Sequence, residues 1–479
     1  MEYYDKDEEI ERLTESLKNS KKSDFEFYDT IEPIYSTGKG LNRKTVEEIS
    51  DIKKEPGWMR ESRLKALDIF LSKPMPTWGP DLSGINFDNL TYYTRPGENK
   101  AKSWDDVDPK IKDTFTKLGI PAMEQKYLAG SVAQYDSEGV YGSLRKEWES
   151  KGVIFTDLDT AVQKYPDLVK EYYCKAIPPS DNKFAALNGA VWSGGSFLYV
   201  PKNVHIDLPL QTYFRMNGEQ SGQFEHTIVI ADEGASVHYI EGCTAPRYNT
   251  SSLHTAIVEI YARKNSNVKY TSVQNWSDSV YNLPVKRAWV DEGAHMDWVT
   301  GELGSKVTMI YPSSYLRGKG ASTSNLQITL ATKGTFKDAG GKAIHLAPDT
   351  TSRIVSKSIS LDDGLTAYRG LVRMNEGASR AKSHVQCDAL LINNDSKNYT
   401  YPFDEIYEPT AEFSHEATVG KIGTDELTYM RSRGLSEDEA SSMIVLGFMD
   451  DIMKEIPMEF AVEMNRLVKL EMSKMGAVG

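Results

Sequence analysis

The chain has 479 residues, of which 39% are hydrophobic and 26% charged, so it can bury a sizeable core. Its 56 basic and 69 acidic residues give a net charge of −13, and no basic stripe offers itself to nucleic acid or to an anionic membrane. The longest apolar stretch, near residues 443–449, is far shorter than the roughly 20 residues of a transmembrane helix, and the acidic start lacks the basic and apolar regions of a signal peptide. We therefore expect a cytoplasmic protein.

Residues 1–185 are predicted to form a mainly helical domain. Its expected helices cover residues 45–54, 58–71, 142–151 and 157–173, and the first two are separated by Pro56-Gly57. The first twenty or so residues are charged, and we expect a partner to order them. Pro178-Pro179 then marks the end of the domain.

The middle of the chain contains turn-like positions at a near-constant interval. They are separated by 31, 31, 28, 27, 29 and 28 residues and lie at Asn203, Gly234, Asn265, Gly293, Gly320, Asp349 and Gly377. Self-similarity at this period predicts stacked β coils, so we expect residues 186–420 to form a parallel β-helix. A second turn series at Gly304, Gly334 and Gly364 falls about half a period later, which favours two strands and two corners in each coil.

After the repeats the pattern becomes helical, and residues 421–479 are predicted to form a C-terminal helical domain. Ser436 to Glu439 is a capping-box sequence before an expected helix over 440–455, and Pro457 suits the first turn of a last helix. These Met-rich and Leu-rich helices either cap the β-helix or offer a docking surface to a partner.

One phase of the repeat carries polar or sulfur-bearing residues. Nine or ten residues after six of the turn positions, and one period to either side, lie Arg215, Cys243, Gln274, Glu302, Thr329, Ser358, Cys387 and Glu416. In register these residues would form a column, because strands of adjacent coils lie about 4.8 Å apart. A slip of one residue would turn a side chain to the opposite face. Apolar neighbours such as Ile328 and Ile359 favour an outward orientation for Thr329 and Ser358.

Cysteine chemistry in this chain must use isolated thiols. The three cysteines cannot form a disulfide framework, and no CxxC pair offers a zinc site. Cys174 fits a small buried residue. Cys387 and Glu416 would lie one coil apart, with His415 beside Glu416, and thiolate, imidazole and carboxylate all suit iron. Neighbours on a strand point to opposite faces, so only one of His415 and Glu416 would face a given site, and the alternative is a buried thiol beside a surface His-Glu pair.

The chain resembles the SufB family of iron–sulfur cluster assembly scaffolds over nearly its whole length. The segments that carry the resemblance include Glu55-Pro56-Gly57-Trp58-Met59-Arg60, Leu144-Arg145-Lys146-Glu147-Trp148, Ser383-His384-Val385-Gln386-Cys387-Asp388-Ala389-Leu390-Leu391, Tyr401-Pro402, His415-Glu416-Ala417-Thr418, Lys421-Ile422-Gly423, Gly447-Phe448 and Glu459-Phe460-Ala461. The resemblance implies a right-handed parallel β-helix, a C-terminal domain that holds the ATPase SufC, and a second subunit, SufD or another SufB, beside the β-helix. Its sister SufD is disfavoured by the Cys387 and Glu416 context and by the long N-terminal part.

The resemblance also implies roles for particular residues. Cys387 and Glu416, helped by His415, would hold iron and a nascent, transient iron–sulfur cluster. Cys243 would accept sulfur from a cysteine desulfurase system. The route between the two sites would be lined by Arg215, Asn217, Gln274, Trp276 and Lys286.

That route agrees with the spacing of the cysteines. Cys243 and Cys387 are 144 residues apart, which is about five repeats or roughly 25 Å. A persulfide anion needs hydrogen-bond donors along such a path, and Arg215, Gln274 and Lys286 can supply them. The alternative is that these polar groups satisfy one another inside the coils.

Several features separate this chain from an enzyme and from some relatives. It has no cysteine-rich motif near the N-terminus, and Ser396 stands where a further thiol could follow Cys387. No Walker motif occurs, so we expect an assembly scaffold rather than an enzyme, with ATP hydrolysis supplied by a partner. Reduced flavin is left open as a cofactor of the complex, although no Gly-rich dinucleotide fingerprint is present.

Two other functions remain open at this point. A β-helix enzyme acting on polysaccharide would need acidic calcium ligands, and Asp362-Asp363 is the nearest candidate, but with Gly364 it reads as an ordinary turn. A docking subunit for SufC without its own cluster site would not require Cys387 or Glu416.

Overall fold

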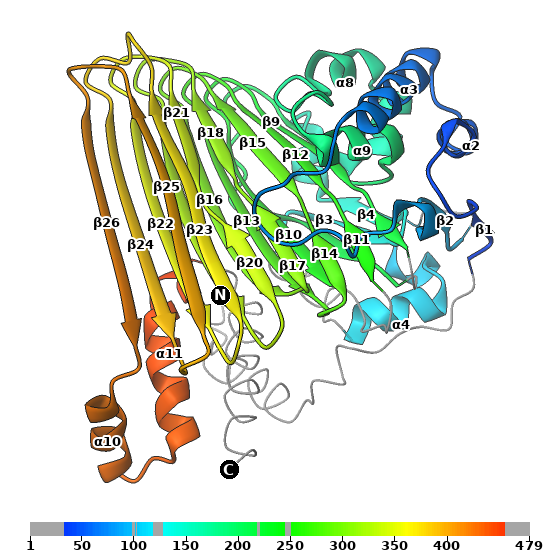
Figure 1. Cartoon of the computed structure of the whole chain (residues 1–479). Helices are drawn as coiled ribbons and strands as arrows, with labels where there is room; N and C mark the ends of the chain where they lie inside the picture. The colour runs from blue at the N-terminus through cyan, green and yellow to red at the C-terminus, as the bar shows by residue number, and fades with distance from the viewer. Residues whose placement is uncertain are drawn as a thin grey trace, which may run out of the picture.

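The structure is a computed structural model that describes residues 33–97, 101, 103–117, 128–217, 221–244 and 251–455. A long stack of strands forms the body of the molecule, with most helices at its early end and two helices beside its late end (Figure 1). The fold is therefore mainly β with helical flanks, as the sequence predicts. The expected order of the first twenty residues and the helix expected after Pro457 lie outside the described residues.

The early part of the chain combines helices with strands that start the β-helix. The helices are α2 (Arg43–Ile52), α3 (Gly57–Ser72), α4 (Pro109–Lys117), α6 (Lys146–Ser150), α7 (Leu158–Lys164), α8 (Pro166–Tyr172) and α9 (Lys183–Val191). The strands are β1 (Tyr35–Ser36), β2 (Thr94–Arg95), β3 (Gly130–Tyr135), β4 (Glu138–Leu144) and β5 (Ile154–Asp157). The helix expected over 142–151 is thus reduced to α6, because β4 pairs with β3 up to Leu144. Pro166 divides the helix expected over 157–173 into α7 and α8.

Two long sheets form the walls of the β-helix. The first contains β4 and β3 followed by β7 (Leu210–Arg215), β10 (Ser236–Thr244), β13 (Asn267–Trp276), β16 (His295–Gly304), β19 (Ser322–Ala331), β22 (Thr351–Ser360), β24 (Lys382–Leu391) and β26 (Glu412–Lys421). The second contains β5, β6 (Ser196–Val200), β8 (Gly222–Gln223), β9 (His226–Ala231), β11 (Ser252–His254), β12 (Ile257–Ala262), β14 (Val280–Asn282), β15 (Val285–Val290), β17 (Val307–Ile310), β18 (Ser313–Leu316), β20 (Phe336–Ala339), β21 (Lys342–His345), β23 (Leu365–Met374) and β25 (Lys397–Ile406). From β6 onward, successive coils pair in parallel, as in β10 with β13. β3 and β5 precede residue 185 and yet extend these two sheets. The predicted domain boundary at residue 185 stays a prediction.

The corners of the coils lie where the sequence places them. All seven turn positions have positive φ values, from 56° at Asn265 to 84° at Gly377, a region that Gly and Asn adopt at low cost. The backbone amide of each corner donates to the next coil along the chain, as Asn203 N does to Glu233 O at 2.9 Å. In the last full coil, however, Asp349 N bonds to Ser379 O, so the equivalent corner is Arg380, with φ 57°. The late corner therefore lies three residues beyond the predicted one.

The number of strands per coil changes along the stack. Early coils have three strands, for example β10, β11 and β12, whereas only the last coils have the predicted two. Pro284 and Pro312 interrupt the second side of the early coils, because proline cannot donate to a ladder. In β23 the chain instead continues through Arg369-Gly370, and this one strand pairs with both β20 and β21.

Both faces of the first sheet carry clusters of buried apolar side chains. Inside the coils, a continuous cluster includes Tyr239, Tyr270, Trp298 and Val290. Outside, Ile328 packs with other aliphatic side chains against the helix α11 (Glu437–Met453), which follows α10 (Thr424–Ser432). Thr329 and Ser358 consequently face inward, and the outward orientation expected for them is wrong because α11 covers the outer face.

The helix α11 follows the capping box that the sequence predicts, whereas α10 is not predicted. Ser436 N donates to Glu439 Oε2 at 2.8 Å and Glu439 N donates to Ser436 Oγ at 3.3 Å, which is a capping box. An ion pair of 2.6 Å between Lys357 and Asp451 fastens α11 to β22. Among the described residues, no helix is both long and apolar enough to span a membrane.

A buried histidine makes the stability of the stack sensitive to acid. His345 is fully buried, its two ring nitrogens lie 2.8 Å from Thr350 Oγ1 and Ser352 Oγ, and burial lowers its pKa from 6.5 to about 4. The folded chain thus binds fewer protons than the unfolded chain between these values, so stability is present above pH 6.5 and is lost as the pH falls toward 4. We expect about 3 kcal/mol of unfolding free energy to be lost over this window. The check is denaturant unfolding at several pH values for wild type and His345→Gln, whose curve should be flatter.

The control for this effect is His205→Gln, because His205 is exposed. It should follow the wild-type pH dependence. Parallel curves for wild type and His345→Gln would show that His345 does not carry the acid sensitivity.

Candidate functional site

Cys243 lies on the inner face of β10 and is buried among polar side chains of neighbouring strands. Its Sγ lies 3.9 Å from Glu241 Oε1, which also accepts hydrogen bonds from Gln274 Nε2 at 2.8 Å and Lys286 Nζ at 3.0 Å. Trp276 Nε1 donates to Gln274 Oε1 at 2.7 Å. Four of the predicted site residues therefore meet in one network centred on Glu241, which the sequence analysis did not single out.

The charges in this network hold the Cys243 thiol in its protonated form. Burial is the largest single influence on Glu241 and opposes its ionisation, but Lys286, Tyr270 and His254 together outweigh it and lower the pKa of Glu241. Burial, followed by the negative charge of Glu241, raises the pKa of Cys243 well above its ordinary value. The thiol is therefore neutral at rest, and Glu241 is the nearest carboxylate that its proton faces.

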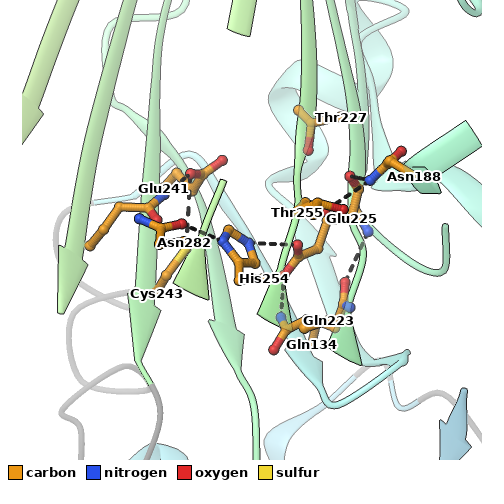
Figure 2. A network of polar contacts seen from close by, with 12 residues as sticks. Gln134, Asn188, Gln223, Glu225, Thr227, Glu241, Cys243, His254, Thr255 and Asn282 are labelled. Atoms are coloured by element: carbon orange, nitrogen blue, oxygen red, sulfur yellow. Dashed lines mark hydrogen bonds and ion pairs between the residues drawn. The ribbon is translucent and has the colours of Figure 1, made fainter. Parts of the chain in front are cut away.

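A buried histidine extends the network to the second sheet. Figure 2 shows His254 between Glu225 and Asn282, close to Cys243 and Glu241. His254 Nε2 lies 2.9 Å from Glu225 Oε2, and its Nδ1 lies 2.6 Å from Asn282 Oδ1. Both partner atoms accept, so both ring nitrogens donate. Burial is the largest single influence and would lower the pKa of His254, but Glu225, Asn282 and Glu241 together outweigh it and raise that pKa, which favours the protonated ring.

Arg215 and Asn217 occupy a different position from Cys243. Arg215 pairs with Thr244 on β10, one residue from Cys243, so its side chain leaves β7 on the opposite face of the sheet. Asn217 follows β7 by two residues, and its backbone amide donates to Asp136 Oδ1 at 2.6 Å. Arg215 thus leaves the sheet on the face opposite to Cys243, and Asn217 lies two residues beyond the end of β7. Their predicted part in a sulfur route stays a prediction.

The predicted column is continuous over five coils and then shifts. Cys243, Gln274, Glu302, Thr329 and Ser358 pair in sequence across β10, β13, β16, β19 and β22. Ser358 then pairs with Ala389 instead of Cys387. Ser358 lies nine residues after the corner at Asp349, and Ala389 lies nine residues after the corner at Arg380, so Ala389 takes the place in the column that the sequence analysis assigns to Cys387. Cys387 still points inward, because it is two residues from Ala389 and two residues are one period of a strand.

Cys387 belongs to a second inner column, which we call the Cys387 row. Successive pairs give the row Glu241, Ser272, Thr300, Gln327, Ser356 and Cys387. All six residues are buried. The row therefore starts at the carboxylate beside Cys243 and ends at the other inner cysteine, over five inter-strand steps of about 4.8 Å, or roughly 24 Å.

The middle of the inner wall contains polar atoms without protein partners. Thr300 Oγ1, Glu302 Oε1, Asn325 Oδ1 and both side-chain polar atoms of Gln327 are buried and make no hydrogen bond within the described chain. Native structures leave few such groups, and water, a ligand or a functional role accounts for each of them. Around Cys243, Glu241, Gln274, Lys286 and Trp276 satisfy one another, as one reading of the sequence expects, although Thr212 Oγ1 on the strand beside Glu241 has no partner within the described chain.

Two titratable groups lie beside this stretch. Burial raises the pKa of Glu302 to about 8, so that it carries a proton at neutral pH. Burial also lowers the pKa of Lys337 to about 7, and its Nζ lies 2.7 Å from Ser305 Oγ. The middle of the inner wall can thus donate or accept protons near neutral pH.

At the late end, Cys387 contacts two side chains, His415 and Tyr368, and His415 in turn contacts Asp404. Its Sγ lies 3.4 Å from His415 Nε2, and His415 Nδ1 lies 3.4 Å from Asp404 Oδ2. Tyr368 also hydrogen-bonds to Cys387, while burial raises the pKa of this thiol to about 12. Without a metal, Cys387 is therefore a protonated thiol, and an incoming cation must displace that proton.

Glu416 does not join this group within the chain. It pairs with Gln386 and is exposed, whereas Cys387 pairs with Ala417 on the other face of β26. As expected, the side chains of His415 and Glu416 point to opposite faces of β26, and the His415 side chain is the one that faces Cys387. A ligand role for Glu416 stays a prediction.

The last coil has free edges and an apolar surface. Among the described strands, β26 pairs only with β24 and β25 only with β23, so each has one side of its backbone unpaired within this part of the chain. The exposed apolar side chains of this end are Tyr399, Tyr401, Phe403, Ile406, Tyr407 and Val419. Contiguous exposed apolar groups beside an open edge are typical of a surface that another protein covers.

Comparison with known proteins identifies the family. Residues 214–448 match the model described as SUF system FeS cluster assembly, SufBD core domain, and residues 129–212 match the SufBD protein N-terminal region. An iron–sulfur cluster assembly SufBD family protein of Staphylococcus aureus (strain MRSA252) is 54% identical over 453 residues, which is 95% of this chain and 97% of that protein. The chain belongs to the SufBD family. A SufBD family protein of Staphylococcus haemolyticus has the same identity and coverage.

Within this SufBD chain, several residues of the site carry no sequence signal of their own. Glu241, His254, Tyr368 and Asp404 lie on four different strands, β10, β11, β23 and β25, and are brought together by the folding of the coils. The sequence Glu241-Gly242-Cys243 could have drawn attention to Glu241, since residues two apart on a strand share a face. The pair Asp362-Asp363 instead serves a turn: Asp362 has φ 56°, and Asp363 Oδ1 accepts from Gly334 N at 2.7 Å.

Proposed function

We propose that the chain is a SufB-type scaffold subunit that accepts sulfur at Cys243 and builds a nascent iron–sulfur cluster at Cys387. The observation that carries this proposal is the Cys387 row, whose polar atoms join the two inner cysteines and lack partners at Thr300 and Gln327. A subunit that only docked SufC would not need such an interior, because buried unpaired polar groups cost free energy.

Sulfur acceptance at Cys243 is a transfer between thiols. The Cys243 proton passes to Glu241, and the thiolate attacks the outer sulfur of a donor persulfide that a cysteine desulfurase system supplies. The sulfur–sulfur bond of the donor breaks, and the donor leaves as a thiol after taking up a proton. Lys286 and His254 compensate the negative charge that this step places beside Glu241.

At the other end, Cys387 and His415 supply a thiolate and an imidazole to iron, and Asp404 orients His415 through its second ring nitrogen. Glu416 contributes a carboxylate when the free edge of β26 is paired by a partner. Iron and sulfide are the substrates of this site, and the finished cluster passes to recipient proteins. Flavin stays open as a cofactor of the complex.

Two partners follow from the surfaces of the chain. The exposed apolar end at β25 and β26 supports docking of SufD or of a second SufB-type subunit. The C-terminal helices support docking of SufC, since Tyr429 on α10 and Met443 on α11 are exposed. Hydrolysis of ATP by SufC would then change the shape of the complex to admit iron or to release the cluster.

The experiment that tests this function separates loading from passage. Sulfur from a desulfurase is supplied to the chain in complex with SufC and its sister subunit, and sulfane sulfur and acid-labile sulfide are measured. We expect Cys243→Ser to abolish both signals. We expect Gln327→Leu to keep sulfane sulfur on Cys243 but to lower sulfide about tenfold, the effect of one lost hydrogen bond of about 1.5 kcal/mol to a charged group.

Gln327→Leu should leave stability unchanged or raised, because it removes two unpartnered polar atoms. The matched control is Ser324→Ala, on the outer face of the same strand, which should behave as wild type. Sulfide delivery that is equal in Gln327→Leu and wild type would exclude the Cys387 row as the route.

A further inference from the structure

A second group of potential ligands lies outside the coils, under the N-terminal helices. One ligand atom each of Cys174, His226 and Glu259 can be chosen so that all three lie within 4.8 Å of one another. Cys174 follows α8 in a turn with φ 56°, His226 starts β9, and Glu259 lies on the adjacent strand β12. Three separate segments thus converge on one point where helices and β-helix meet.

Glu259 is the centre of this group. Its Oε2 accepts from Cys174 N at 2.8 Å and faces His226 Nε2 at 2.9 Å. Its Oε1 accepts from the backbone amides of Ala176 and Ile177 at 2.7 and 2.9 Å. The carboxylate therefore holds the loop after α8 against β12 and brings Cys174 to the same oxygen that His226 faces.

His226 has one ring nitrogen without a partner. The residue is fully buried, and its ring lies 4.8 Å from the Tyr173 ring and 6.0 Å from the Trp192 ring. Because Glu259 Oε2 only accepts, Nε2 donates to it, and Nδ1 makes no hydrogen bond within the described chain. The unpartnered nitrogen belongs to a fully buried ring that forms one group with a thiol and a carboxylate, and a bound cation would give this group a partner.

The donor set matches one class of metal. Zinc binds thiolate, imidazole and carboxylate, and sites with three protein ligands leave a fourth position for water. A divalent ion with one thiolate and one carboxylate is neutral overall, which suits a buried position. Cys174 is only half-buried and provides a path from solvent.

We propose that Cys174, His226 and Glu259 bind a zinc ion that fastens the loop after α8 to β9 and β12. On binding, the Cys174 thiol releases its proton to solvent, and no oxidation is involved. The site is separate from the two inner cysteines and does not depend on the scaffold function.

The chain offers a direct test because it has only three cysteines. In untagged full-length Cys243→Ser/Cys387→Ser protein, Cys174 is the sole thiol, so a thiolate-to-metal absorption band can arise only there. Cobalt(II) is titrated anaerobically as a coloured substitute for zinc. We expect one equivalent to produce the near-ultraviolet thiolate band and zinc to remove it, and we expect the band to be lost on adding Cys174→Ser.

A second measurement guards against loss of fold. Thermal unfolding with and without zinc should show a rise in midpoint in the Cys243→Ser/Cys387→Ser protein and none after Cys174→Ser, while circular dichroism establishes that the variant is folded. His226→Gln, which can keep a hydrogen bond to Glu259, should weaken cobalt binding by about tenfold or more. Absence of the band, or equal binding after Cys174→Ser, would overturn the proposal and leave the three residues as an anchor for the loop.

Discussion

Replacing Cys387 with serine, or His415 with alanine, is expected to lower the iron and sulfide of the reconstituted complex by about tenfold or more, the loss typical of a removed ligand or its close support. Cys387 Sγ lies 3.4 Å from His415 Nε2, so both donor atoms already face the position that a shared iron would occupy. The measurement is anaerobic reconstitution of the chain with SufC and its sister subunit, followed by iron and sulfide analysis and absorbance.

Two variants of the same strands make this result interpretable. Lys382→Met changes an exposed side chain on the outer face of β24, away from both Cys387 and Glu416, and should retain the cluster. Glu416→Ala should lose it only if the carboxylate reaches iron once a partner covers the edge of β26. Full cluster content in Cys387→Ser and His415→Ala would mean that these residues are structural and that the site lies elsewhere.

The largest loss of stability is expected from Lys286→Met. Lys286 Nζ lies 3.0 Å from Glu241 Oε1, and the side chains of the pair are 0% and 2% exposed. Removing one member of a buried ion pair leaves the other charge uncompensated, which costs about 3–5 kcal/mol of unfolding free energy. Chemical denaturation followed by tryptophan fluorescence measures the change.

The double variant Lys286→Met/Glu241→Gln should recover much of this loss, because it removes both charges. Lys202→Met serves as the surface control, since the ion pair of Lys202 with Glu233 is 57% and 44% exposed and is expected to contribute less than about 1 kcal/mol. If Lys286→Met cost no more than Lys202→Met, the charge of Glu241 would be balanced by other groups.

The sequence predicts the fold well because the corners of a β-helix have a strict backbone requirement. Positive φ restricts a corner to Gly, Asn or Asp in most coils, so the period can be read from the residue types. It fails at Arg380, because an arginine in this conformation has no sequence signal, while nearby Gly377 also has positive φ. That one corner displaces Cys387 by two positions in the predicted column.

The candidate site was only partly predictable for a different reason. Contacts along the stack follow the period, as for Cys243 and Gln274, and can be inferred from spacing. Contacts across the interior, such as Lys286 with Glu241 or His415 with Asp404, join strands of different sheets and depend on side-chain length and on the cross-section of the coil. No interval in the sequence encodes them.

The position of Cys387 in the stack has a consequence for its dynamics. In a solenoid each coil is stabilised mainly by its immediate neighbours, so opening propagates inward from a terminal coil. β25 and β26 have one neighbour each, and Cys387 lies on β24, a single strand layer from this end. The free energy of local opening is therefore lower at the strands that carry Cys387 than at strands in the middle of the stack, such as β16. A subunit that pairs with the edge of β26 would raise the free energy of opening at this end. Binding of that subunit and solvent access to Cys387 would therefore be thermodynamically coupled.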